Sequence, residues 1–246
     1  MVEGGLPRGG VVMKGRERPT CATCSVKDPI CSVEGGRGPK TCPMRNYSDT
    51  IEKVLKEYEK PEIREFARIA SIQEAECYSN RHIRPFVRHP VKPRVQEVCE
   101  FAKKMGYRKL GIAFCGGLRS EARALSRILE AQGFEVVSVS CHVGRASKEV
   151  IGIREEEKIR IGQFEAMCSP IVQATILNEE NTDFNILVGL CVGHDSLFFK
   201  YARGPTTVLI VKDRVLGHNP VAALYNVEGY YSRMLWPGID RKSTPG

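Results

Sequence analysis

The stretch Lys109-Leu-Gly-Ile-Ala-Phe-Cys-Gly-Gly117 is an apolar run of strand length that ends in a cysteine and two glycines. Similar apolar runs follow at residues 135–140, 185–190 and 206–211. Patterns typical of helices lie between them at residues 120–132, 155–168 and 169–177. Apolar strands that alternate with helices favour a parallel sheet covered on both faces. The sequence therefore predicts an α/β fold whose parallel sheet has about four strands, in the common order 2-1-3-4.

The residues before this sheet are predicted to form three parts. Residues 1–20 are rich in glycine and arginine and are expected to be a flexible tail. Residues 21–48 contain four cysteines in a turn-rich sequence, and so short a segment needs a metal because it cannot bury its own core. Residues 49–106 have the apolar spacing of a helical connector, interrupted by a basic loop. Residues 107–246 then make up the α/β domain.

Four cysteines are expected at one edge of the predicted sheet. Cys115, Cys141 and Cys191 each follow a strand, and Cys168 precedes the helix that opens at Ser169-Pro170. Ligands of α/β folds gather at the carboxyl ends of the strands, and neighbouring strands lie only about 4.8 Å apart. Helix N-termini also favour thiolates. These four thiols are predicted to bind one cofactor, a 4Fe-4S cluster, although small buried hydrophobic residues would give the same pattern.

Histidines accompany these cysteines. His142 follows Cys141, and the sequence Cys191-Val-Gly-His194-Asp195 places two titratable side chains just beyond another strand. His194 and Asp195 are the candidate catalytic residues. The sequence leaves open whether His194 binds metal, donates a proton to a substrate, activates Cys191 or donates a hydrogen bond to a cluster sulfur. Asp195 is a candidate to hold the imidazole tautomer, and His218 is expected at the same edge.

A second cysteine set, Cys21-Ala-Thr-Cys24 with Cys31 and Cys42, precedes the helices. The C-x-x-C pair makes a chelate loop and the two later thiols close a tetrahedron, which indicates a metal site. Four thiolates suit structural zinc, whereas a cysteine followed by proline, as at Cys42-Pro43, is also common in iron-sulfur proteins. The spacing is typical of neither a zinc ribbon nor a ferredoxin, so both metals stay open.

The composition favours a cytoplasmic protein without a membrane anchor. No apolar run reaches the roughly 18 residues needed to cross a bilayer, and the first residues lack the apolar stretch of a signal peptide. The ten cysteines, in a reducing compartment, are better explained by metal binding than by disulfides. Cys77 and Cys99 lie outside both sets and are expected to pack in the core.

The net charge of +8 is partly concentrated between Arg81 and Arg94, a segment with no acidic residue. Neither regularly interleaved aromatic residues nor a recognisable nucleic-acid module accompany these charges. We expect a solvated connecting loop that can dock an acidic partner surface. A redox partner protein or a larger complex is therefore expected as the partner, in preference to nucleic acid or a membrane.

Four segments resemble a known family: Cys21-Ala-Thr-Cys24-Ser-Val-Lys27, Gly111-Ile-Ala-Phe-Cys115-Gly-Gly-Leu118, Gly189-Leu-Cys191-Val-Gly-His194-Asp195-Ser-Leu-Phe198 and Val211-Lys-Asp-Arg-Val-Leu-Gly-His218-Asn219-Pro220. They cover most of residues 20–220. The family is an uncharacterised, cysteine-rich one, the domain of unknown function 1847, known mainly from anaerobes. The resemblance implies metal binding by the cysteines and assigns no activity. The anaerobic distribution that it implies favours iron-sulfur clusters at both sites.

Three functions are compatible with these features. The first is an iron-sulfur protein that transfers electrons or binds a small redox substrate at the carboxyl edge of the sheet. The second is a thiol enzyme in which zinc holds the amino-terminal segment and Cys191 or Cys115 is a nucleophile assisted by His194. The third is a non-catalytic, cluster-bearing subunit or metal carrier of a larger complex. Walker, Gly-x-Gly-x-x-Gly and His-Glu-x-x-His motifs are absent from the sequence, which argues against nucleotide hydrolysis, classical dinucleotide binding and zincin proteolysis.

Overall fold

The computed structural model describes residues 16–236, so most of the tail expected at residues 1–20 lies outside the described residues. The chain divides into two compact units, Met1–Arg68 and Ile69–Gly246. The boundary falls inside helix α3 (Pro61–Glu76). The four-part division drawn from the sequence stays a prediction.

The first unit consists of short helices and turns. Its elements before α3 are η1 (Cys21–Thr23), α1 (Pro43–Asn46), α2 (Ser48–Leu55) and η2 (Lys56–Glu59). Pro61 begins α3, in the first helical turn where proline is tolerated. None of residues 16–68 is buried. This agrees with the expectation that the cysteine segment cannot build a hydrophobic core of its own.

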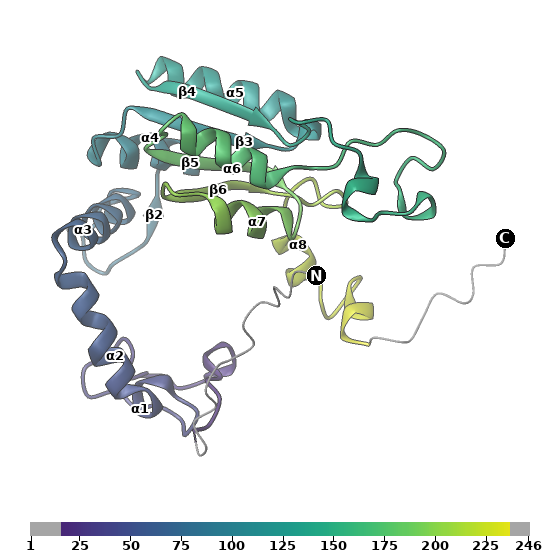
Figure 1. The fold of residues 1–246 in the computed structure, drawn as a ribbon. Coiled ribbons are helices and arrows are strands. Elements are labelled where there is room, and N and C mark those ends of the chain that lie inside the picture. Colours follow the sequence, from purple (N-terminus) through teal and green to yellow (C-terminus); the bar gives the residue numbers. More distant parts are fainter. Residues whose placement is uncertain (1–15, 237–246) are drawn as a thin grey trace. The chain divides into compact units, whose positions relative to one another are not determined.

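The second unit is built on one parallel sheet (Figure 1). Its strands are β3 (Lys109–Phe114), β4 (Glu135–Ser140), β5 (Phe184–Leu190) and β6 (Thr206–Val211). The strands lie in the order β4-β3-β5-β6, and each neighbouring pair is parallel. This is the predicted order 2-1-3-4. The α/β fold with a helix-covered parallel sheet is confirmed.

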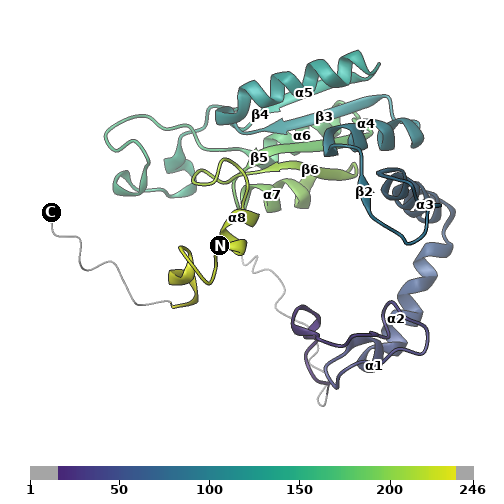
Figure 2. The ribbon, with the colours of Figure 1, turned by 180° about the vertical axis from the view of Figure 1, so that it is seen from behind.

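Helices cover both faces of this sheet, as the two opposite views show (Figures 1 and 2). One face packs against α4 (Arg94–Lys104) and α5 (Arg119–Ala131), and the other packs against α6 (Pro170–Glu179) and α7 (His194–Tyr201). Successive side chains of a strand point to opposite faces. Leu110 and Ile112 of β3 therefore join the first core, whereas Ala113 joins the second. The two cores fix the strands and so fix where their carboxyl ends meet.

The helix predicted at residues 155–168 is wrong. Between β4 and α6 the chain makes turns and two short 3-10 helices, η4 (Lys148–Ile151) and η5 (Glu155–Glu157). The side chain of Lys158 is only 4% exposed and pairs with Glu149 and Glu155. Gly162 adopts a φ of 79°, which an α-helix does not allow. Tertiary ion pairing and a left-handed glycine thus override the apolar spacing that suggested a helix.

The remaining short elements of the described residues lie around this framework. They are β1 (Tyr78–Ser79), β2 (His89–Pro90), η3 (Gly116–Leu118), α8 (Val221–Tyr225) and η6 (Ser232–Leu235). The strand β2 lies in the basic segment and pairs antiparallel with β1. In the described part of the chain, no helix combines the length and the apolar character that crossing a bilayer requires.

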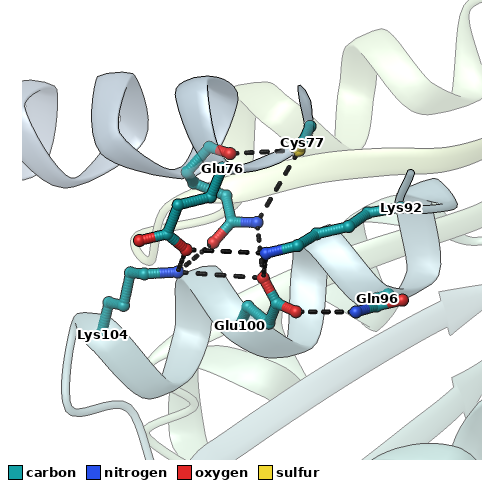
Figure 3. Close-up of polar contacts among 7 residues, drawn as sticks. Glu76, Cys77, Lys92, Gln96, Glu100 and Lys104 are labelled. Atoms are coloured by element: carbon teal, nitrogen blue, oxygen red, sulfur yellow. Dashed lines mark hydrogen bonds and ion pairs between the residues drawn. The ribbon is translucent and has the colours of Figure 1, made fainter. Parts of the chain in front are cut away.

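A polar network joins the end of α3 to α4 (Figure 3). Glu100 of α4 receives hydrogen bonds from Lys92 at 2.5 Å, Gln96 at 2.8 Å and Gln73 at 2.9 Å. Burial alone would raise the pKa of Glu100, but these hydrogen bonds outweigh it and lower the pKa to about 2. The network thus keeps a half-buried carboxylate charged between the end of α3 and α4.

Cys77 and Cys99 lie within this packing, away from both cysteine sets. They are 7% and 4% exposed, so they are buried as expected. Burial raises the pKa of both thiols. Cys99 packs in the hydrophobic core, and the Cys77 thiol donates a hydrogen bond to the Gln73 carbonyl at 3.0 Å. Because both thiols are buried outside the two cysteine sets, they are useful controls for the other cysteines.

Candidate metal centre

The carboxyl ends of β3 and β4 bring two cysteines together. Cys115 follows β3, and its N–H donates to the Val188 carbonyl at 3.0 Å. Cys141 follows β4, and its N–H donates to the Phe114 carbonyl at 2.9 Å. The two side chains lie close enough for Cys141 to raise the pKa of the Cys115 thiol. The parallel pairing of β3 with β4 therefore places Cys115 and Cys141 side by side, as the strand order 2-1-3-4 predicted.

Cys168 reaches the same edge from the start of α6. The N–H of Ser169 donates to the Cys141 carbonyl at 2.7 Å, which holds Cys168 beside Cys141. Donor atoms of Cys141, His142 and Cys168 lie within 4.8 Å of one another, as metal ligands do. Across residues 16–236, this is the only group of three such donor atoms.

Cys191 follows β5 at a point where that strand is irregular. The register of β5 against β6 shifts on both sides of Val188, and Gly189 has a φ of 67°. A Cβ added at Gly189 would lie 2.6 Å from Cδ2 of Leu118, so only glycine fits there. Cys191 interacts electrostatically with Cys168. Cys115, Cys141 and Cys191 therefore follow adjacent strands at one edge of the sheet, and Cys168 lies beside Cys141; these four are hereafter the inner cysteines. Of their sulfurs, only those of Cys141 and Cys168 belong to the group within 4.8 Å, and a shared site for all four stays a prediction.

Interactions among the inner cysteines shift the pKa values of their thiols in different directions. The hydrogen bond with Cys141, together with burial, raises the pKa of Cys115 to about 12. The hydrogen bond from Cys141 lowers the pKa of Cys168 below its ordinary value. The N–H of Gly116 also donates to Sγ of Cys141 at 3.3 Å. The N–H of Gly116 is therefore placed to stabilise negative charge on the Cys141 sulfur.

Two cations that the sequence analysis did not assign lie at this edge. Nη2 of Arg214 donates to Sγ of Cys191 at 3.1 Å. Lys212 and Cys115 both lie next to Gly117, where an added Cβ would be 3.8 Å from Nζ and 3.9 Å from Sγ. The sequence Lys212-Asp-Arg214 directly after a strand could have indicated these cations, because alternate residues of an extended chain point to the same side.

The turn after β6 directs these two cations. Oδ1 of Asp213 accepts hydrogen bonds from the N–H groups of Val215 at 3.0 Å and Leu216 at 2.8 Å. The N–H of Asp213 donates to Nδ1 of His218 at 3.1 Å. The Asp213 carboxylate therefore stabilises the turn and does not pair with either cation. His218 stabilises the same turn, because its Nδ1 accepts the hydrogen bond from the Asp213 N–H.

His194 and Asp195 begin α7, directly after Cys191. The N–H of His194 donates to the Cys191 carbonyl at 2.9 Å, and within residues 16–236 its half-buried imidazole has no hydrogen-bond partner. Oδ1 of Asp195 accepts from the N–H groups of Gly193 at 3.0 Å and Ser196 at 2.7 Å. Asp195 therefore supports the turn into α7, and the structure does not pair it with the imidazole. The possible roles of His194 stay predictions.

The outer cysteines, Cys21, Cys24, Cys31 and Cys42, lie in the first unit. They line one pocket of about 260 Å³ together with apolar residues of the surrounding turns. Three of them are exposed and Cys42 is half-buried. Hydrogen bonds between the backbones of Ile30 and Arg37 and of Arg37 and Asp28 hold the turn beside them. The four thiols therefore face a common space, although no three of them lie within 4.8 Å of one another as the donor atoms of Cys141, His142 and Cys168 do.

The inner donor set fits a metal-thiolate centre. Cysteine thiolates are the ligands of iron-sulfur clusters and of structural zinc, and an imidazole can ligate either metal. Such a centre carries net negative charge when four thiolates bind it. Arg214 and the N–H of Gly116 donate to its sulfurs, which is the environment that stabilises this charge.

Comparison with known proteins identifies the family of the chain. Residues 42–209 match the family model described as "Protein of unknown function (DUF1847)", and the chain belongs to this family. The match spans all four inner cysteines and, of the outer set, Cys42. The chain is also similar to "Uncharacterized protein MJ0455" of Methanocaldococcus jannaschii, with 46% identity over 190 residues, which is 77% of this chain and 90% of that protein. These findings confirm the resemblance seen in the sequence.

Proposed function

We propose that this protein is a cytoplasmic iron-sulfur protein. The inner cysteines, Cys115, Cys141, Cys168 and Cys191, hold a 4Fe-4S cluster at the carboxyl edge of the sheet. The cluster transfers electrons to a partner protein or to a small substrate. The outer cysteines hold a second metal centre, zinc or another cluster, that shapes the first unit.

The observation that carries this proposal is the convergence of thiols from separate elements. Cys115 and Cys141 follow neighbouring strands, and Cys168 is held at the start of a helix by the Ser169 hydrogen bond. Core packing requires neither a group of converging donor atoms nor an arginine that donates to a thiol, and in the described residues the buried Cys77 and Cys99 have neither. A metal-thiolate centre accounts for both features.

The residues of this edge have distinct parts in that function. The four thiolates bind the cluster, which supplies one-electron chemistry when bound. His142 lies within ligand distance of Cys141 and Cys168 and is placed to bind metal or to hold a proton beside it. His194 presents an imidazole without a partner in the described residues, next to Cys191, and so is available to give a proton to a substrate.

Anaerobic purification tests the proposal. Iron, sulfide and zinc would be measured on the full chain, and electron paramagnetic resonance would be recorded after reduction. We expect a brown protein whose reduced cluster signal disappears in Cys141→Ser. Cys99→Ala is the matched control, because it removes a buried thiol outside both sites and should keep the iron. Zinc without iron at the inner site in the wild type would refute the iron-sulfur function.

One observation favours a second candidate, a thiol enzyme that uses Cys191. The guanidinium of Arg214 donates to the Cys191 sulfur, and such a cation stabilises a nucleophilic thiolate. In that case iodoacetamide should alkylate Cys191 faster than the other cysteines in zinc-loaded protein, and His194→Gln should slow that reaction. In an iron-sulfur protein Cys191 should instead be protected until the cluster is removed. Mass spectrometry of the alkylated peptides separates the two candidates.

A further inference from the structure

We infer that Lys212 and Arg214 are positioning residues that offset the negative charge of the inner centre and thereby set its reduction potential. The inference rests on the proposed function, because it assigns these two cations to the metal-thiolate site. Neither residue was a candidate from the sequence. The turn after β6 carries both of them.

The contacts divide the two cations between two of the thiols. Arg214 donates to Sγ of Cys191 at 3.1 Å. Nζ of Lys212 and Sγ of Cys115 would lie 3.8 Å and 3.9 Å from a Cβ at Gly117, and Lys212 interacts electrostatically with the Cys115 thiol. Cys115 and Cys191 follow the adjacent strands β3 and β5. Arg214 therefore lies at the end of β5 and Lys212 near the end of the neighbouring strand β3.

In the part of the chain that the structure describes, no acidic side chain explains the position of either cation. Within residues 16–236, no carboxylate pairs with Lys212 or Arg214. Asp213, the acid between them, accepts from the N–H groups of Val215 and Leu216 and so stays within the turn. Two positive charges without carboxylate partners beside a group of thiols match the charge of a centre with four thiolate ligands.

This arrangement has a defined electrostatic consequence. Reduction adds one negative charge to an iron-sulfur centre, and nearby positive charge favours the more negative state. Hydrogen bonds to ligand sulfurs act in the same direction. Arg214 supplies both a charge and a hydrogen bond, whereas Lys212 supplies charge near Cys115. Both cations should therefore raise the reduction potential of the centre.

The test compares Arg214→Gln, Arg214→Lys and Lys212→Gln in the full anaerobic protein. Redox titration followed by electron paramagnetic resonance should give a lower reduction potential in Arg214→Gln and Lys212→Gln. Arg214→Lys, which keeps the charge, should restore most of the potential. Arg127→Gln, on an exposed position of α5, is the matched control and should leave the potential unchanged. Unchanged potentials in Arg214→Gln and Lys212→Gln would overturn the inference while the iron-sulfur function stands.

Metal affinity decides the inference if the inner site holds zinc. Loss of a residue that supports metal ligands typically weakens metal binding by about 10- to 100-fold. Chelator competition should therefore show inner-site affinity falling about tenfold or more in Arg214→Gln and not in Arg127→Gln. Zinc at the inner site would itself refute the iron-sulfur function and the effect on reduction potential, and the fall in affinity would then support only the role of the cations in offsetting the charge of the centre. Equal affinities would overturn that role, and a wild type without metal at the inner site would overturn both proposals.

Discussion

The side-chain amide of Gln173 donates a 2.7 Å hydrogen bond to the backbone carbonyl of Val139, two residues before Cys141. The same Nε2 donates at 3.1 Å to the carbonyl of Phe114, the residue before Cys115. Gln173 lies on α6, the helix that follows Cys168, and its side chain is fully buried. One amide thus ties together the three segments that carry Cys115, Cys141 and Cys168.

Gln173→Leu should destabilise the fold and disturb the inner centre. The change removes two hydrogen bonds from the interior, which should lower the free energy of unfolding by about 1–3 kcal/mol. Urea denaturation measures this loss, and iron analysis should show reduced occupancy of the inner centre. Gln163→Leu, at an exposed position of the loop before α6, is the control and should change neither quantity. Equal stability of the two variants would show that the Gln173 contacts contribute nothing.

Gly189→Ala should be more destabilising than substitution of an ordinary turn glycine. Both Gly189 and Gly133 have positive φ, at 67° and 91°, but only the Cβ at Gly189 would clash, with Leu118 at 2.6 Å. Gly133→Ala therefore measures backbone strain alone, about 1 kcal/mol. Gly189→Ala should cost about 1–3 kcal/mol more, because the core beside Leu118 is overpacked. Thermal unfolding of the two variants gives the comparison, and equal costs would contradict it.

The sheet could be predicted because its strands carry their own signal. The apolar runs ending at Phe114, Ser140, Leu190 and Val211 were long enough to be recognised, and the cysteines that follow three of them took their places from the register alone. The position of Cys168 followed from the helix start at Ser169-Pro170. These features depend on local pattern plus one topology rule, so sequence reasoning reached them.

The remaining features depend on tertiary contacts that leave no local pattern. Lys158 pairs with Glu149 and Glu155 and holds the loop in turns, whereas its neighbours suggested a helix. The sequence shows Gln173 only as a residue of a helix, and its hydrogen bonds to the strand carbonyls depend on the sheet packed against that helix. Arg214 belongs to a charged segment of the kind that is usually solvated, and only the turn at Asp213 directs it to Cys191. Sequence reasoning therefore found the thiols and missed the residues that support them.

Glu100 should make the stability of the second unit depend on acidic pH. Its folded pKa of about 2 lies below the ordinary value near 4.3, so its stabilising contribution is present above about pH 4.3 and is lost as the pH falls toward 2. Glu100→Gln should therefore lower the free energy of unfolding at pH 7 and make little difference at pH 2. Urea denaturation at both pH values checks this. Glu179→Gln, at an exposed position of α6, is the control and should show no comparable change. A Glu100→Gln cost that is the same at both pH values would contradict the ion-pair explanation.

The outer cysteines should determine whether the first unit holds its shape. None of residues 16–68 is buried, so few apolar contacts order the turns that carry Cys21, Cys24, Cys31 and Cys42. Their thiols line one pocket of about 260 Å³, and a metal bound there would link all four turns. Cys24→Ser should lower the metal content by one site and make residues 16–48 sensitive to limited proteolysis. Cys77→Ala, which removes a buried thiol of the second unit, should leave both the metal content and the cleavage pattern unchanged. An unaltered metal count in Cys24→Ser would show that the outer cysteines bind no metal through this residue.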